Sequence, residues 1–294
     1  MMQSDPVEMS FRGRHGNALH TDAFGDPAAP PIVLVHGGGQ TRHSWHATAS
    51  TLAREGWFAL TLDQRGHGDS AWDKEGRYHY DDFAGDLVAL SAELARPPVL
   101  VGASLGGLAC LLAQGSSEQP VARALILVDI AARMNPAGAQ RIMDFMRARP
   151  DGFANLDEAA DAIAEYNPHR PRPRDPSGLA KNLRRGDDGR WRWHWDPRFM
   201  AIKGRPNAAK NALDQAAAAL DIPTLLVRGQ QSDLLTMEGV EHFRALAPHT
   251  EFCDVTGAGH MVAGDKNDIF SEAVLRFLRK LEDGPRLDPA LSPT

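Results

Sequence analysis

Residues 99–108 have the sequence Val-Leu-Val-Gly-Ala-Ser-Leu-Gly-Gly-Leu, an apolar run that passes through Gly-x-Ser-x-Gly into a helix-forming segment. This pattern predicts a buried strand, a sharp turn at Ser104 and a helix. Gly102 and Gly106 leave the room that such a crowded turn requires. The Ser104 hydroxyl then projects from the sheet. The amide of Leu105, at the N-terminus of the helix, would face an oxyanion formed on a carbonyl that Ser104 attacks.

Short apolar runs alternate with amphipathic segments along most of the chain. We expect strands at residues 32–35, 58–62, 99–101, 124–128, 222–227 and 251–255, and helices at 44–55, 81–94, 237–246 and 269–281. Residues 7–12 and 18–23 are expected to form an opening hairpin. Apolar strands that alternate with helices are typical of a parallel sheet covered on both faces. The sequence therefore predicts an α/β fold with a mostly parallel, doubly wound sheet.

The alternation stops between about residues 131 and 218. Six prolines interrupt helix-like patches in this stretch, and no buried-strand run appears: Pro136, Pro150, Pro168, Pro171, Pro173 and Pro176. We interpret residues 131–218 as an inserted, mostly helical cap on a core made of residues 1–130 and 219–282. Residues 283–294 are rich in proline and are expected to form a flexible tail.

The net charge, the cysteines and the lack of long apolar runs exclude several classes of protein. The 294 residues carry a formal net charge of −6, which gives no electrostatic reason to expect nucleic acid. Cys110 and Cys253 lack the spacing of a metal knuckle or a redox pair. No secretory signal pattern opens the chain, and no run approaches the roughly 18 apolar residues of a membrane span. We expect a cytoplasmic enzyme, monomeric or homodimeric, that acts on a small molecule without membrane, metal or organic cofactor.

A serine needs a base and an orienting carboxylate to act as a nucleophile. His260 is the candidate base, because it follows the last expected strand in a Gly-Ala-Gly-His loop. Asp233 follows the 222–227 strand and is the preferred acid, although it could instead cap the next helix. Asp129 ends the 124–128 strand at the same edge of the sheet and is the alternative acid. The order Ser104, Asp233, His260 matches one known chain order of the triad.

Two further groups of polar residues could suggest a functional site. Residues 63–70, Asp-Gln-Arg-Gly-His-Gly-Asp-Ser, form a turn motif that we interpret as structural, with Arg65 and Asp69 able to pair locally. His43 and His46 have a spacing that could suit a metal, but the sequence nearby offers no acidic or cysteine partner. No metal site is therefore expected there.

The cap contains a cluster of aromatic residues. Trp191, Trp193 and Trp195 alternate, so in an extended segment they would face one way. With Phe145, and with Met261 from the core, they could line an apolar pocket over Ser104. Alternatively, the tryptophans only fasten the cap to the core. A lined pocket would favour a small to medium, moderately apolar substrate, because a cap restricts the access of polymers.

Taken together, these motifs make the chain similar to the α/β-hydrolase family. The resemblance rests on the Ser104 pentapeptide and on several other stretches: residues 35–39 (Val-His-Gly-Gly-Gly), 63–70, 127–129 (Leu-Val-Asp), 227–233 (Val-Arg-Gly-Gln-Gln-Ser-Asp) and 257–260. It implies an oxyanion hole formed by the amides of Leu105 and Gly38. Glycine at position 38, where cofactor-free haloperoxidases carry an aromatic residue, is more similar to esterases, lactonases and carbon-carbon bond hydrolases. Ser104 disfavours epoxide hydrolases and haloalkane dehalogenases, which carry aspartate there.

The resemblance implies acyl transfer. Ser104 would attack an ester or lactone carbonyl, and His260, oriented by Asp233, would move the proton and later activate water. The alternatives are a carbon-carbon bond hydrolase, lyase or perhydrolase on the same triad, or a ligand receptor with low turnover.

Overall fold

A computed structural model of the chain describes residues 5–168, 172–201, 206–260, 262 and 267–283. An eight-stranded sheet forms its centre, in the order β1-β2-β4-β3-β5-β6-β9-β10. The strands are β1 (Val7–Arg12), β2 (Ala18–Phe24), β3 (Pro31–Val35), β4 (Phe58–Leu62), β5 (Val99–Ala103), β6 (Ala124–Val128), β9 (Thr224–Gly229) and β10 (Glu251–Val255). Only β2 runs against its neighbours, β1 and β4. The predicted α/β fold with a mostly parallel sheet is confirmed.

The strands of the parallel part are apolar because they are covered on both faces. In β3, Ile32 and Leu34 pack into one apolar cluster, while Val33 and Val35 pack into another. All residues of β3, β4 and β6 are buried. An uninterrupted apolar run is the sequence pattern that this environment selects.

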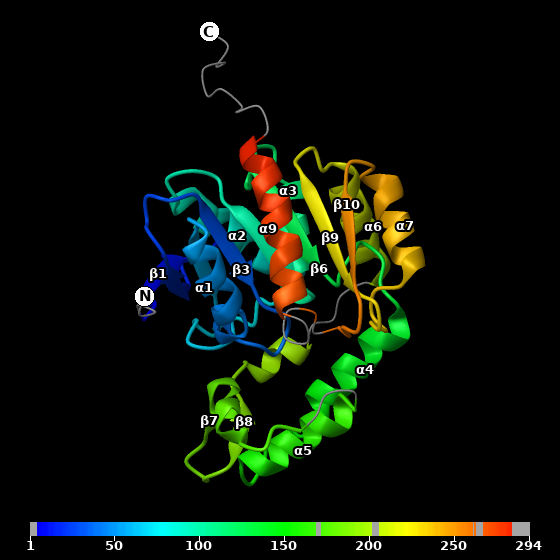
Figure 1. Ribbon diagram of the computed structural model, residues 1–294. Coiled ribbons are helices and arrows are strands. Elements are labelled where there is room, and N and C mark those ends of the chain that lie inside the picture. Colours follow the sequence, from blue (N-terminus) through cyan, green and yellow to red (C-terminus); the bar gives the residue numbers. More distant parts are fainter. Residues whose placement is uncertain (1–4, 169–171, 202–205, 261, 263–266, 284–294) are drawn as a thin grey trace.

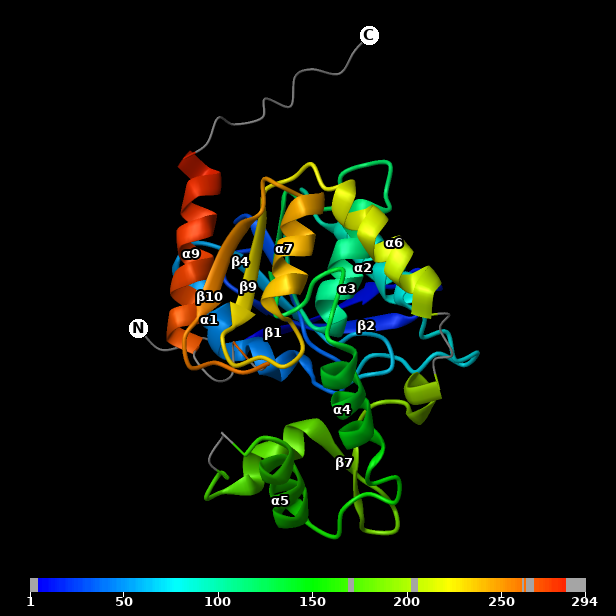
Figure 2. The same cartoon turned by 90° about the vertical axis from the view of Figure 1, so that its right-hand side faces the viewer.

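Helices cover the two faces of this sheet (Figures 1 and 2). One face carries α1 (His46–Arg54) and α9 (Asn267–Asp283), and the other carries α2 (Tyr80–Glu93), α3 (Leu105–Gly115), α6 (Pro206–Ala218) and α7 (Met237–Leu246). Among the described residues, no helix combines the length and apolar character needed to cross a bilayer.

A second lobe lies beyond the carboxyl ends of the strands (Figures 1 and 2). Helix α4 (Pro136–Arg147) leads into it, and α5 (Leu156–Tyr166) and the 3₁₀ helix η2 (Pro176–Asn182) belong to it. It also contains the antiparallel pair β7 (Leu183–Arg185) and β8 (Trp191–Trp193), which the sequence did not predict. These strands are too short and too exposed to produce an apolar run.

The boundary predicted at residue 218 places α6 in the cap, whereas in the structure α6 packs against α3 of the core. The 3₁₀ helix η3 (Pro197–Ala201) precedes α6 and packs against α4. The predicted flexible tail begins at Asp283, and its remaining residues lie outside the described ones.

Candidate functional site

Ser104 lies at the turn from β5 to α3, with a φ of 48° and a ψ of −118°. This left-handed conformation is costly for a residue with a side chain and is maintained only where the surroundings impose it. A Cβ at Gly102 would lie 2.5 Å from the Gly106 carbonyl oxygen, and one at Gly106 would lie 2.5 Å from that of Val35. Both glycines of the motif are therefore required by close backbone approach, as the sequence predicts.

The loop after β3 lies directly beside the serine. A Cβ built on Gly37 would be 3.3 Å from the Ser104 Cβ, and one built on Gly38 would be 3.8 Å from the Leu105 Cβ. The two residues expected to form the oxyanion hole are thus neighbours. Leu105 is the first residue of α3, where a backbone N–H has no acceptor within the helix.

Two buried histidines hold this loop in place. His36 donates from Nδ1 to the Gly37 carbonyl at 2.7 Å and accepts at Nε2 from the Gln64 amide at 3.1 Å. His67 accepts at Nε2 from the Gly39 amide at 3.1 Å, and its Nδ1 donates to the Arg65 carbonyl. Each ring is therefore neutral. Neither histidine was expected as a positioning residue, although His36 directly follows a buried strand, which was an available signal.

His260 pairs with Asp129. Its Nδ1 lies 2.7 Å from the Asp129 Oδ2, and the Asp129 side chain is fully buried while that of His260 is 18% exposed. The same carboxylate accepts from the Gly229 amide at 3.0 Å and from the Ser232 hydroxyl at 2.5 Å. Asp129 has a φ of 52°, a conformation that aspartate tolerates better than most residues. This backbone turn aims a strand-end carboxylate at the histidine.

Asp233, the acid preferred from the sequence, pairs with an arginine in the structure. Asp233 forms an ion pair with Arg141 of α4, at 2.6 Å, and its side chain is 36% exposed. It does not cap α7 either, because Thr236 accepts the capping hydrogen bond from Gly239. The alternative acid, Asp129, is the carboxylate that contacts His260.

The loops after β9 and β10 are packed tightly enough to fix this arrangement. The Gln230 amide donates to the Val255 carbonyl at 3.0 Å, and the Gln231 amide donates to the Ala258 carbonyl at 2.9 Å. A Cβ on Gly229 would overlap the carbonyl oxygen of Gly259, the residue before His260. The position of the histidine is thus set by backbone contacts between neighbouring strand ends.

The turn at residues 63–70 is structural, but its ion pairs differ from the prediction. Arg65 is bidentate to Asp86 of α2, at 2.7 and 2.6 Å, and Asp69 accepts from Arg42 at 2.6 Å. The proposed pairing of Arg65 with Asp69 was therefore wrong, because each has a partner from a distant part of the chain. The turn fastens the His67 loop to β2, to α2 and to the 3₁₀ helix η1 (Arg42–Trp45).

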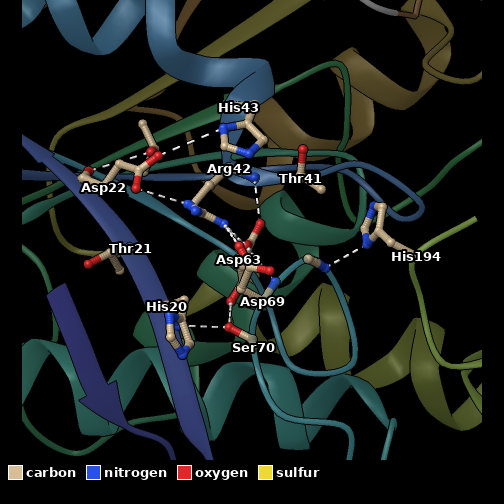
Figure 3. A network of polar contacts seen from close by, with 12 residues as sticks. His20, Thr21, Asp22, Thr41, Arg42, His43, Asp63, Asp69, Ser70 and His194 are labelled. Carbon is tan, nitrogen blue, oxygen red and sulfur yellow. Dashed lines mark hydrogen bonds and ion pairs between the residues drawn. The ribbon is translucent and has the colours of Figure 1, made fainter. Parts of the chain in front are cut away.

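The histidine pair at the start of α1 has the acidic partner that the sequence seemed to lack. The Asp22 Oδ2, in β2, lies 2.7 Å from the His46 Nε2. It lies 3.8 Å from the His43 Nδ1 (Figure 3). The reason for expecting no metal site there was therefore wrong.

The predicted aromatic residues of the cap divide into two groups. Phe145 and Trp193 line a cavity of about 360 Å³ whose other lining residues also belong to the cap. Trp195 stacks on Trp193, with centroids 5.1 Å apart, and comes within 2.9 Å of a Cβ built on Gly39. Trp191 does not line the cavity, although it packs with Phe153, which does, and Met261 lies outside the described residues. A continuous aromatic path thus joins the cap cavity to the loop beside Ser104.

Three buried histidines predict how stability depends on pH. Burial lowers the pKa of His36 to about 4, that of His67 to about 3 and that of His194 to about 2, from 6.5. Below pH 6.5 the unfolded chain binds protons that the folded chain does not. The free energy of unfolding should therefore fall with decreasing pH, by up to about 1.4 kcal/mol per pH unit for each histidine.

Urea unfolding at several pH values between 7.5 and 4.5 measures this slope. The aspartates with lowered pKa values contribute mainly around and below their ordinary value of 3.8, so they act in a lower window. A free energy of unfolding that stays constant between pH 6.5 and 5 would contradict the expectation.

Comparison with known proteins identifies the family. Residues 30–266 match the family described as alpha/beta hydrolase fold. The chain is 30% identical over 267 residues to the 3-hydroxybutyrate-oligomer hydrolase of Cupriavidus necator, covering 86% of this chain and 89% of that one. It is 30% identical over 259 residues to esterase Rv0045c of Mycobacterium tuberculosis, covering 84% and 82%.

Solved structures agree on the fold. E-2-(acetamidomethylene)succinate hydrolase superposes with a TM-score of 0.80 at 22% identity, over 93% of this chain and 99% of that one. Esterase Rv0045c superposes with a TM-score of 0.72 at 25% identity, over 97% and 93%. The chain therefore belongs to the α/β-hydrolase fold family, whose named relatives here are esterases and other hydrolases.

Proposed function

We propose that the protein is a serine carboxylic-ester hydrolase in which Ser104 is the nucleophile, His260 the general base and Asp129 the orienting acid. The observation that carries this proposal is the 2.7 Å contact between the His260 Nδ1 and the buried Asp129 carboxylate. The strained turn at Ser104 supports it, because such strain concentrates at functional sites.

The hydrogen bond between His260 and Asp129 supports a separate role for each nitrogen of the imidazole. The Asp129 Oδ2 accepts a hydrogen bond from the His260 Nδ1, so the neutral imidazole carries its proton on Nδ1. Nε2 is then left as the basic atom. Nε2 takes the Ser104 proton as Oγ attacks the ester carbonyl, and then gives it to the leaving alcohol. In the second half of the cycle, Nε2 accepts a proton from the water that attacks the acyl-enzyme. It gives this proton to the Ser104 Oγ as the bond between Oγ and the acyl carbon breaks, which releases the acid and regenerates the enzyme.

Charge develops on two atoms during each attack. The negative charge on the former carbonyl oxygen is stabilised by the Leu105 and Gly38 amides. The positive charge on the imidazolium is stabilised by Asp129, whose carboxylate is fixed by the Gly229 amide and the Ser232 hydroxyl. Because the Gly229 amide and the Ser232 hydroxyl already hold Asp129 before the reaction, the carboxylate need reorganise little as the imidazolium charge develops.

A short-chain or hydroxy-acid ester is the substrate class that we favour. The relative from Cupriavidus necator is named for the hydrolysis of 3-hydroxybutyrate oligomers. The cavity of about 360 Å³ that Trp193 helps to line is mainly apolar, and its charged lining residues are Arg141, Asp144, Arg149 and Glu165. A cavity of this size suits a small to medium acyl or alcohol group.

Pre-steady-state release of p-nitrophenol from acetyl to octanoyl esters tests the chemistry, with 3-hydroxybutyrate dimers and a simple lactone as further substrates. We expect a burst equal to the enzyme concentration, or steady turnover, that is absent in Ser104→Ala. A fluorophosphonate should add one label per chain, located on Ser104 by mass spectrometry. Labelling elsewhere, or ester turnover that persists in folded Ser104→Ala, would refute the proposal.

A further inference from the structure

Three potential ligand atoms converge outside the active site. The Asp22 Oδ2, the His43 Nδ1 and the His46 Nε2 are separated by 2.7, 3.2 and 3.8 Å. Asp22 comes from β2, His43 from the 3₁₀ helix η1 (Arg42–Trp45) and His46 from the first turn of α1. None of them belongs to the Ser104, Asp129 and His260 constellation.

The spacing of these atoms suits a four-coordinate transition-metal ion. Zn²⁺ binds histidine nitrogen and carboxylate oxygen at about 2.0–2.2 Å, so two ligands at a tetrahedral angle lie roughly 3.3–3.6 Å apart. The observed separations lie on both sides of this value. Small side-chain rotations would bring all three atoms to an ion placed at their centre.

The surroundings hold the carboxylate ready. Asp22 is 3% exposed, and its second oxygen, Oδ1, forms an ion pair with the Arg42 guanidinium, 3.0 Å from Nε. This contact leaves Oδ2 directed toward the histidines. Polar contacts to the atoms of a metal ligand that do not bind the ion commonly orient the ligand in this way. The imidazole of His46 packs edge-on against Phe24, with centroids 5.3 Å apart.

The site is open on one side. The side chains of His43 and His46 are 25% and 29% exposed, so an ion can enter from solvent and retain a water as its fourth ligand. Two imidazoles and one carboxylate favour Zn²⁺ and its neighbours Co²⁺, Ni²⁺ and Cu²⁺ over Mg²⁺ or Ca²⁺.

The charge of the adjoining network also favours a cation. One guanidinium, that of Arg42, pairs with three carboxylates, those of Asp22, Asp63 and Asp69 (Figure 3). One positive and three negative groups give these four side chains a formal charge of −2. A divalent ion beside Asp22 would neutralise it.

From this geometry we propose that Asp22, His43 and His46 bind a divalent transition-metal ion of the Zn²⁺ class. The ion joins β2 to the start of α1 and so stabilises the segment that leads out of the Gly37–Gly39 loop. It takes no part in ester cleavage.

Equilibrium dialysis with Zn²⁺ and the visible d–d absorption of added Co²⁺ test the proposal on the full chain. We expect one ion per chain, a tetrahedral Co²⁺ spectrum and a higher Tm with Zn²⁺. His43→Gln and His46→Gln should each weaken binding at least about tenfold while ester turnover shows that the fold is intact.

Two matched variants serve as controls. His15→Gln alters another histidine that pairs with an aspartate, Asp82 at 3.2 Å, and His260→Gln removes the candidate base of the active site. Both should keep the ion. Unchanged affinity in His43→Gln and His46→Gln, loss of the ion in His260→Gln, or no binding by the parent chain would each overturn the proposal.

Discussion

Replacing Asp129 with asparagine should lower kcat for a carboxylic ester by about 10⁴-fold and leave KM nearly unchanged. The amide would present an N–H group to the Nδ1 of His260 in place of the carboxylate that accepts there now. The ring would then carry its proton on Nε2, where it cannot take the proton of Ser104. The carboxylate also stabilises the imidazolium, and a neutral amide does not. Steady-state kinetics on a p-nitrophenyl ester gives both parameters.

Asp233→Asn is the matched control, since it makes the same chemical change at the other candidate acid. It removes only the ion pair with Arg141, whose side chain is 59% exposed. Exposed pairs of this kind contribute at most about 1 kcal/mol, so kcat should stay within about fivefold of the parent value. If kcat instead fell strongly in Asp233→Asn and stayed near the parent value in Asp129→Asn, Asp233 would be the residue that orients His260.

Gly106→Ala should lower the free energy of unfolding by about 3 kcal/mol or more. The added Cβ would lie 2.5 Å from the Val35 carbonyl oxygen and 2.6 Å from that of His36. Both oxygens belong to the backbone at the end of a central strand, where no side chain can rotate away. The turn at Ser104 and the Gly37–Gly39 loop would be forced apart, so any folded fraction of the variant should also lack ester turnover. Urea unfolding followed by circular dichroism measures the loss.

Gly178→Ala provides the comparison. Gly178 lies in η2 and has no atom within 4 Å of an added Cβ, so its stability should change by no more than about 0.5 kcal/mol. If Gly106→Ala were as stable as Gly178→Ala, the close approach of α3 to β3 would be wrong.

The central strands and the serine turn could be predicted because local sequence determines them. β3 and β6 are apolar throughout, β4 is apolar except for Thr61, and the Ser104 motif combines glycines with a strand-to-helix transition. The β7–β8 hairpin escaped prediction because each strand is three residues long and only part of each is covered. Short strands of this kind depend on tertiary packing more than on local preference.

The choice between Asp129 and Asp233 could not be made from the sequence. Both follow parallel strands that are neighbours, so both lie at the correct edge of the sheet. Which of the two carboxylates contacts His260 depends on the left-handed backbone conformation of Asp129 and on the close contact of Gly229 with the loop that carries His260. Likewise, Asp22 is 21 residues from His43 in the chain. The two side chains lie close together only because β2 passes beside α1.

Three consecutive residues after β9 connect the catalytic core to the cap. Ser232 donates to Asp129, Asp233 pairs with Arg141, and the Leu234 carbonyl accepts from the amide of Asn135, at the start of α4. A chimera that receives the cap of another family member, to change which esters it accepts, would therefore also alter the partners of this loop. Because such grafts replace Asn135 and Arg141 together, whereas Asp233→Asn removes only one contact, they should change turnover together with selectivity unless residues 135–141 are kept from this chain.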